Sequence, residues 1–157
     1  PGTFDPITYG HIDVIKKSLK IFDKLIIATT DNTDKNYSFS VNERLDIINN
    51  SLFKDLKLSK KKIKVISFDN LTIELCKRYK ANAIIRGLRA VSDFEYEFQL
   101  AGMNKKLNSK IETMFLMSDV ENQIISSKFV KEIANLGGNI DRFVTRYTVK
   151  MLKNKFL

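Results

Sequence analysis

Apolar residues in this chain follow two kinds of spacing. Near the start, an apolar residue recurs every three or four positions, at Ile12, Ile15, Leu19 and Phe22. This spacing predicts a helix with one apolar face. Short apolar runs occupy 25–29, 83–85 and 113–117, and 63–68 is predicted as a further strand. Short runs of this kind are typical of strands buried on both faces of a sheet, so the chain is predicted to alternate between helices and buried strands.

Further helices are predicted to open at capping residues. The capping positions, in chain order, are Ser40, Asn70, Ser92 and either Ser126 or Ser127. Ser40 and Ser92 are each followed three positions later by a glutamate, which completes a capping-box pattern. The glycine pair at 137–138 is suited to end the helix that begins near Ser126. Residues 141–157 are predicted to form a terminal helix.

Strands that alternate with helices, without hairpin signals, favour an α/β fold. A length of 157 residues suits a single domain. We therefore expect one Rossmann-like domain over 1–157, with a doubly wound parallel sheet and helices on both faces. Ligands bind beyond the carboxyl ends of the strands in such sheets. The loop at 1–11 should itself follow a strand, so we expect a short apolar strand before Pro1 at the centre of the sheet.

The composition narrows the class of protein. The net charge is +9, but the lysines are scattered and the densest group, at 57–64, has no interleaved aromatic residues, so no nucleic-acid partner is expected. One cysteine excludes an internal disulfide, and with one histidine it leaves no zinc site made of protein ligands. Without a signal peptide or a membrane-spanning run, a cytoplasmic protein with no membrane partner is expected. The P-loop and G-x-G-x-x-G patterns are also absent.

The loop at 1–11 carries the candidate phosphate chemistry. It brings Thr3, Thr8 and the only histidine, His11, to the start of the first helix. A helix start has unpaired backbone N–H groups and a positive partial charge, and both favour anions. Gly10 removes a side chain that would block a ligand. The alternative is an ordinary surface turn in which His11 only caps or packs.

A second polar group follows the third predicted strand. Arg86 and Arg89 flank Gly87 there, and guanidinium groups suit bidentate phosphate contacts. The alternative is a surface cluster of ion pairs with Asp93 and Glu97.

A third group is the serine pair at 126–127, which opens a helix after the strand that ends at Met117. By itself, a serine pair at a helix start is an ordinary cap. Paired with the helix start at Gly10, it would let two positive helix ends face one polyphosphate. This inventory suits positioning and charge stabilisation of a phosphoryl group, since no carboxylate pair is placed for acid–base catalysis.

The string at 1–11 resembles the nucleotide-binding signature of the T/H-x-G-H nucleotidyltransferases. With 85–89, 93–97, 125–127 and 130–132, the chain resembles the bacterial phosphopantetheine adenylyltransferase family over nearly its whole length. This resemblance implies the reaction of ATP with 4′-phosphopantetheine to give dephospho-coenzyme A and pyrophosphate, a step of coenzyme A biosynthesis. It also implies Mg²⁺ bound through the phosphates of ATP, and a homohexamer.

The resemblance implies roles residue by residue. The catalytic residues would be Thr3 and His11 at the α-phosphate, Arg89 beside the leaving pyrophosphate, and Lys35. Further ATP contacts would come from Phe4, Gly87, Leu88, Glu97, Asn122, Gln123, Ile124, Ile125, Ser126, Ser127 and Lys128. The contacts to phosphopantetheine would come from Thr3, Lys35, Thr72, Arg86, Leu100 and Asn104. Two of these have alternatives, since Thr72 suits the first turn of a helix and Leu100 suits the core.

The departures from the family pattern cluster in one segment. The family usually has an aromatic, a small residue and a second aromatic at the positions of Asn122, Gln123 and Ile124, and a hydroxyl at that of Lys128. We therefore expect altered contacts to adenine and an intact α-phosphate end. Lys128 either adds a charged contact to the phosphates or points into solvent.

Two other functions stay open at this point. A nicotinate- or nicotinamide-mononucleotide adenylyltransferase, or a cytidylyltransferase, would share the phosphate chemistry, although 93–97 resembles the phosphopantetheine family specifically. A basic RNA-binding module without catalysis belongs to a different class. Its binding would weaken steeply with salt, but scattered lysines do not outline the groove that it needs.

Overall fold

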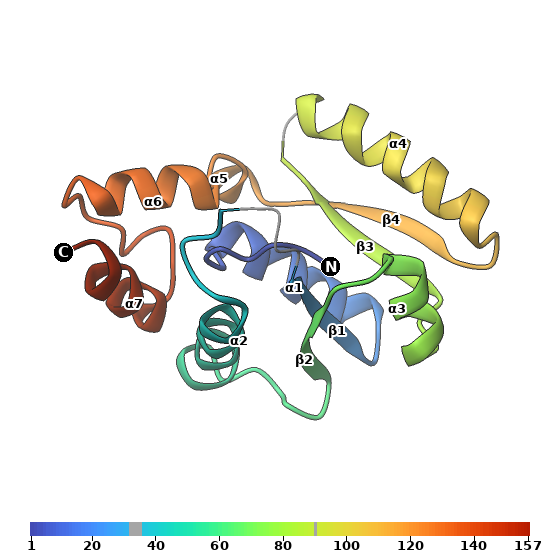
Figure 1. Cartoon of the computed structure of the whole chain (residues 1–157), viewed down its shortest axis with the longest axis horizontal. Coiled ribbons are helices and arrows are strands. Elements are labelled where there is room, and N and C mark those ends of the chain that lie inside the picture. Colours follow the sequence, from blue (N-terminus) through green and yellow to red (C-terminus); the bar gives the residue numbers. More distant parts are fainter. Residues whose placement is uncertain (32–35, 90) are drawn as a thin grey trace.

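Figure 1 shows the computed structural model of the chain, which describes residues 1–31, 36–89 and 91–157. Helices and strands alternate along it, as the apolar spacing predicts. The helices are α1 (Tyr9–Ile21), α2 (Val41–Asn49), α3 (Thr72–Tyr79), α4 (Val91–Leu107), α5 (Val120–Gln123), α6 (Ser127–Asn135) and α7 (Arg146–Phe156). The strands are β1 (Leu25–Thr30), β2 (Ile63–Phe68), β3 (Ala83–Leu88) and β4 (Glu112–Met117). A π-helical stretch, Asn50–Asp55, continues α2.

The four strands form two parallel pairs. β1 lies beside β2, with Leu25 opposite Ile63, and β3 lies beside β4, with Ala83 opposite Glu112. The parallel α/β architecture is confirmed, but the described strands do not form one continuous sheet, because β1 and β3 make no ladder with each other. A further apolar strand between β1 and β3 would join the pairs. The strand expected before Pro1 stays a prediction.

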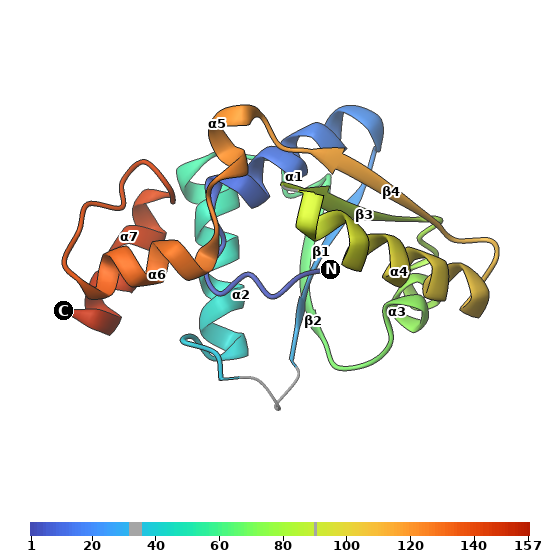
Figure 2. The same ribbon diagram turned by 90° about the horizontal axis from the view of Figure 1, so that it is seen from above.

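Different helices pack on the two pairs of strands. α2 packs on β1 and β2, whereas α1 and α4 both pack on β3 and β4. α6 and α7 lie together at one end of the molecule, and α3 and α4 at the other (Figures 1 and 2). Among the described helices, none is both long enough and apolar enough to cross a membrane.

The main core reaches directly under the first loop. It joins apolar side chains of α1, β1, α2, α6 and α7, and it includes Phe4 and Ile7 from the loop itself. Ile7 has no exposed surface. Burial of two such side chains anchors the loop by the hydrophobic effect, so this part of the chain has a fixed position although it is neither helix nor strand.

Several predicted boundaries are confirmed. β2 covers the predicted run, and Ser40 forms the expected capping box, since its hydroxyl accepts from the Glu43 amide at 3.3 Å. Ser126 caps α6 by accepting from the Phe129 amide at 3.2 Å. α6 ends just before Gly137, whose positive φ of 75° suits glycine at this position.

Other boundaries differ from the predictions. α3 is capped at Leu71 rather than at Asn70, and α4 begins before Ser92, so neither predicted cap occupies the cap position. β3 continues through Arg86 to Leu88 because these residues pair with β4. The short helix α5 was not predicted, since four residues are too few to show a helical repeat. The terminal helix begins only at Arg146.

Gly87 allows α1 to approach β3 closely. A Cβ placed on Gly87 would lie 2.9 Å from Cγ2 of Val14 on α1, well inside normal contact distance. Since α1 carries His11 at its start and β3 carries Arg86, this contact sets how near the two functional elements lie.

We predict that Gly87→Ala lowers the free energy of unfolding by about 1–3 kcal/mol, because the added methyl overpacks the contact with Val14. Val14→Ala removes the clashing atom. The double variant should therefore lose less free energy of unfolding than the sum of the losses in the two single variants. Urea unfolding of the four proteins measures this coupling. Strictly additive effects would show that the two residues do not limit the approach of α1 to β3.

Candidate active site

The candidate site is built on the first loop, which a buried carboxylate holds in place. Asp5 is 4% exposed. Its oxygens accept from the backbone amides of Ser38 and Phe39, each at 2.9 Å, and from Nζ of Lys131 at 2.7 Å. Lys131 belongs to α6, so one side chain joins the first loop to segment 36–39 and to α6. A buried charge paired in this way is costly to disturb, which keeps the loop in one conformation.

His11 projects from the start of α1 as a neutral hydrogen-bond donor. Its Nδ1 accepts from the Thr8 backbone amide at 3.1 Å and lies 3.0 Å from the Thr8 hydroxyl. Because Nδ1 is an acceptor, the ring proton of the neutral form resides on Nε2. Burial, with smaller contributions from Arg89 and Arg86, lowers the pKa of His11 to about 4. The Phe4 ring packs edge-on against the imidazole, with centroids 5.1 Å apart.

Two arginines approach the site in ion pairs. Arg86 donates to both carboxylate oxygens of Glu97, from Nε at 2.8 Å and from Nη2 at 2.6 Å, and Nη1 donates to the Pro1 carbonyl at 2.6 Å. Arg89 Nε donates to Asp93 at 3.1 Å. The alternative prediction of ion pairs with Asp93 and Glu97 is therefore confirmed. Each arginine can still donate to a phosphate, since a guanidinium has more N–H groups than these contacts use.

The start of α6 lies against the start of α1. Ser127 donates to the Pro6 carbonyl at 2.7 Å, which ties α6 to the first loop. A Cβ on Gly10 would lie 3.1 Å from the Asn122 carbonyl oxygen and 3.3 Å from that of Ile125. Glycine at this position thus allows the backbone of 122–125 to pass close to α1, and it brings two helix starts together as predicted.

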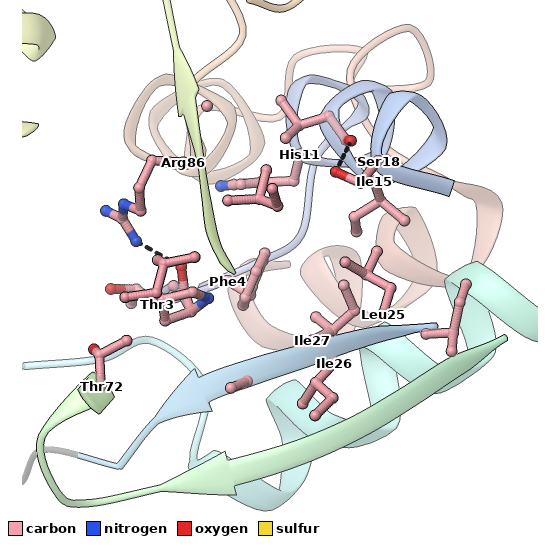
Figure 3. Close-up of a pocket in the computed structure, with 18 of the residues that line it drawn as sticks. Thr3, Phe4, His11, Ile15, Ser18, Leu25, Ile26, Ile27, Thr72 and Arg86 are labelled. Atoms are coloured by element: carbon pink, nitrogen blue, oxygen red, sulfur yellow. Dashed lines mark hydrogen bonds between the residues drawn. The ribbon is translucent and has the colours of Figure 1, made fainter. Parts of the chain in front are cut away.

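Most of these groups line one cavity of about 1220 Å³. In Figure 3, His11 from α1, Arg86 from β3 and Thr3 from the first loop face this cavity, which apolar residues of α1 and β1 also line. The predicted site residues along its wall are Thr3, Phe4, His11, Thr72, Arg86, Gly87, Arg89, Glu97, Ile125, Ser126, Ser127 and Lys128. Segments far apart in sequence therefore meet around one cavity.

Other predicted residues lie away from the cavity wall. These are Leu88, Leu100, Asn104, Asn122, Gln123 and Ile124. Ile124 is 77% exposed, and Gln123 turns back to donate to the Ser118 carbonyl at 3.0 Å. Asn104 is buried on α4. Lys35 lies outside the described residues.

Asp5 was not among the predicted site residues. It directly follows Thr3 and Phe4 in the first loop. Phe4 and Pro6 on either side of Asp5 are buried in the structure, which takes the carboxylate into the interior, and buried carboxylates require partners. The partner, Lys131, lies 126 positions away, and no local pattern could have identified it.

Comparison with known proteins identifies the family. The cytidylyltransferase-like family matches residues 1–133. A phosphopantetheine adenylyltransferase of Pelagibacter ubique (strain HTCC1062) is 68% identical over 156 residues, covering 99% of this chain and 95% of that protein. The chain belongs to the phosphopantetheine adenylyltransferase family. A family member of the same name from Rhizorhabdus wittichii is 49% identical and covers 96% of this chain and 88% of its own length.

Solved structures support the nucleotidyltransferase fold. The nicotinic acid mononucleotide adenylyltransferase of Plasmodium falciparum, complexed with NaAD, superposes with a TM-score of 0.68 at 15% identity, covering 98% of this chain and 92% of that one. A putative nicotinate-nucleotide adenylyltransferase from Vibrio parahaemolyticus gives 0.62 at 18% identity, covering 96% and 87%. At these identities the likeness concerns the Rossmann-like fold alone.

The lowered pKa of His11 predicts how stability depends on pH. Between pH 6.5 and about 4, the unfolded chain protonates His11 whereas the folded chain does not, so the unfolded state binds more protons and stability falls as the pH is lowered. The loss should reach at most about 3 kcal/mol. Urea unfolding at pH 7, 5.5 and 4 should show a smaller loss in His11→Gln. Equal losses in both proteins would mean that His11 titrates normally in the folded state.

Proposed function

We propose that this chain transfers the adenylyl group of ATP to 4′-phosphopantetheine, giving dephospho-coenzyme A and pyrophosphate. A phosphate oxygen of phosphopantetheine would bond to the α-phosphorus of ATP while the bond from that phosphorus to the pyrophosphate oxygen breaks. Family membership supports the substrates. The observation that carries the chemistry is the neutral His11 donor, which faces the same cavity as Thr3 and Arg86.

His11 would stabilise the charge that develops on the α-phosphate. Its Nε2–H is the free donor, because Nδ1 is engaged by Thr8. A donor that is already oriented and needs no protonation at neutral pH acts by electrostatic stabilisation rather than by proton transfer. The Thr3 hydroxyl would bind the same phosphate from the first loop.

The remaining phosphates would bind at the start of α6 and at the arginines. Ser126 and Ser127 open α6 beside the start of α1, so backbone N–H groups and helix dipoles favour the polyphosphate there. Arg89 would contact the leaving pyrophosphate. Arg86, oriented by its bidentate pair with Glu97, would contact the phosphate of phosphopantetheine. By family resemblance we assign Lys35 to that same phosphate.

Mg²⁺ would enter the site with ATP rather than bind a protein cage. Within 1–31, 36–89 and 91–157, no group of three or more His, Cys, Asp or Glu side chains is placed to hold a metal ion. The carboxylate of Asp5, in the first loop, already accepts from two backbone amides and an ammonium group. The described side chains therefore do not form a coordination shell, and no step here is assigned to the metal. We further propose a homohexamer, as the resemblance implies, and a cytoplasmic location, as expected from the sequence.

We predict that the chain releases pyrophosphate from ATP and Mg²⁺ with 4′-phosphopantetheine and not with nicotinate mononucleotide. His11→Ala should lower kcat by roughly a hundred- to thousandfold, the usual effect of losing one such donor, with little change in ATP affinity. A pyrophosphate-release assay measures the rates, and calorimetry measures ATP binding. Release with nicotinate mononucleotide alone would overturn the proposed substrate, and near-normal turnover of His11→Ala would remove His11 from the mechanism.

Lys128 tests the departure from the family pattern. It is exposed, opens α6 beside Ser127 and lines the cavity, so we predict that its charge contacts the phosphates of ATP. Lys128→Ser should weaken ATP binding by about two- to fivefold, and the loss should shrink as salt is raised, because exposed charges are screened. Lys150→Ser, exposed on α7 away from the cavity, is the matched control. Equal ATP affinities in the two variants would show that Lys128 points into solvent.

A further inference from the structure

Arg44 is a buried cation at a position of α2 where the helical spacing calls for an apolar side chain. It lies in the first half of α2, at helical spacing from Ile47 and Ile48, and all three side chains have 0% exposure. None of the ion pairs formed by the described residues involves Arg44. Burial of a guanidinium for which the described residues supply no carboxylate costs free energy that burial of an apolar side chain would not, so its presence calls for a role other than packing.

The guanidinium of Arg44 is bound by backbone and hydroxyl oxygens from three segments. Nη1 donates to the Thr3 carbonyl at 2.9 Å, to the Thr29 hydroxyl at 2.9 Å and to the Thr30 carbonyl at 2.8 Å. Nε donates to the Phe39 carbonyl at 3.2 Å. The Tyr37 ring lies 4.1 Å from the guanidinium carbon. These acceptors come from the first loop, the carboxyl end of β1 and segment 36–39.

These contacts converge on the backbone of Thr3. The Thr3 carbonyl accepts from Arg44 and also from the Thr29 hydroxyl, at 2.9 Å. Segment 36–39 is held from two sides, since the Phe39 amide donates to Asp5 and its carbonyl accepts from Arg44. Arg44 does not line the cavity, so it acts on the site through Thr3 and not by touching a substrate.

We propose that Arg44 is a positioning residue for adenylyl transfer. It fixes the peptide of Thr3 so that the Thr3 hydroxyl meets the reacting phosphate, and it places a permanent positive charge beneath the loop that receives the phosphates. This inference rests on the proposed function, because it assigns Arg44 a role through a residue of that site. Two donor nitrogens are required, since Nη1 serves the acceptors of Thr3, Thr29 and Thr30 while Nε serves the Phe39 carbonyl.

The test is Arg44→Lys, which keeps the charge but has a single donor nitrogen, so it cannot serve both the acceptors of Nη1 and the Phe39 carbonyl. Its kcat for pyrophosphate release should fall by about ten- to a hundredfold, the usual effect of displacing a reacting group slightly, while the Kd for ATP changes by less than about threefold. In the Thr3→Val background, Arg44→Lys should cause no further fall, because no hydroxyl remains to be positioned. Arg142→Lys, exposed before α7, is the matched control.

Each outcome bears on the proposal. Unchanged kcat in Arg44→Lys would overturn it, as would an equal fall in kcat in the Thr3 and Thr3→Val backgrounds, which would indicate a general structural effect. Urea unfolding verifies that each variant is folded. If Arg44→Lys is unfolded, Arg44→Met, which completes the apolar face of α2, replaces it with the same expectations for kcat and for the Thr3→Val background. A wild-type chain that releases no pyrophosphate would overturn the proposed function instead, and this inference with it.

Discussion

The candidate site depends on a loop that is neither helix nor strand and yet has a single conformation. The carboxylate of Asp5 and the apolar anchors Phe4 and Ile7 hold it from beneath. Each interaction is strong because it is buried, where a charge must keep its partners. The loop also pairs with β1 at Gly2, whose amide donates to the Ala28 carbonyl at 2.9 Å and whose carbonyl accepts from the Thr30 amide at 3.0 Å. It can therefore present its Thr3 hydroxyl and Pro6 carbonyl at fixed positions.

Electrostatics at the site follow from the same burial. Two arginines nearby favour anions, and they would repel a protonated imidazole. Together with burial they lower the pKa of His11, so that the ring is a neutral donor at neutral pH. The arginines are themselves held by Glu97 and Asp93, which limits their motion without neutralising every N–H group. Positive charge for phosphate and a neutral hydrogen-bond donor thus coexist in one cavity.

Sequence reasoning reached the fold because its signals are local. Apolar runs identified the four described strands, and the capping boxes and glycines located several helix ends. Candidate site residues of the first loop, of 86–89 and of α6 were also predicted, because hydroxyls, arginines and helix starts suited to phosphate mark these segments in the sequence. The pairing of strands into two separate ladders, and the contacts of Asp5 with Lys131, arise between residues distant in sequence. Arg44 left a detectable signal, a charge on the apolar face of α2, but its partners are mostly backbone carbonyls, which no sequence pattern encodes.

The altered segment at 122–124 shows why the phosphate end of the site can persist while other side chains change. Gly10 brings α1 against the carbonyl oxygens of Asn122 and Ile125, and Lys17 on α1 donates to the Met117 carbonyl and to Asp119. The backbone of this segment is thus held by α1, whatever side chains it carries. Ile124 projects outward and Gln123 bonds to its own chain. A substitution here therefore changes the side chains of this segment without moving Ser126 and Ser127, whose positions depend on the first loop and on α6.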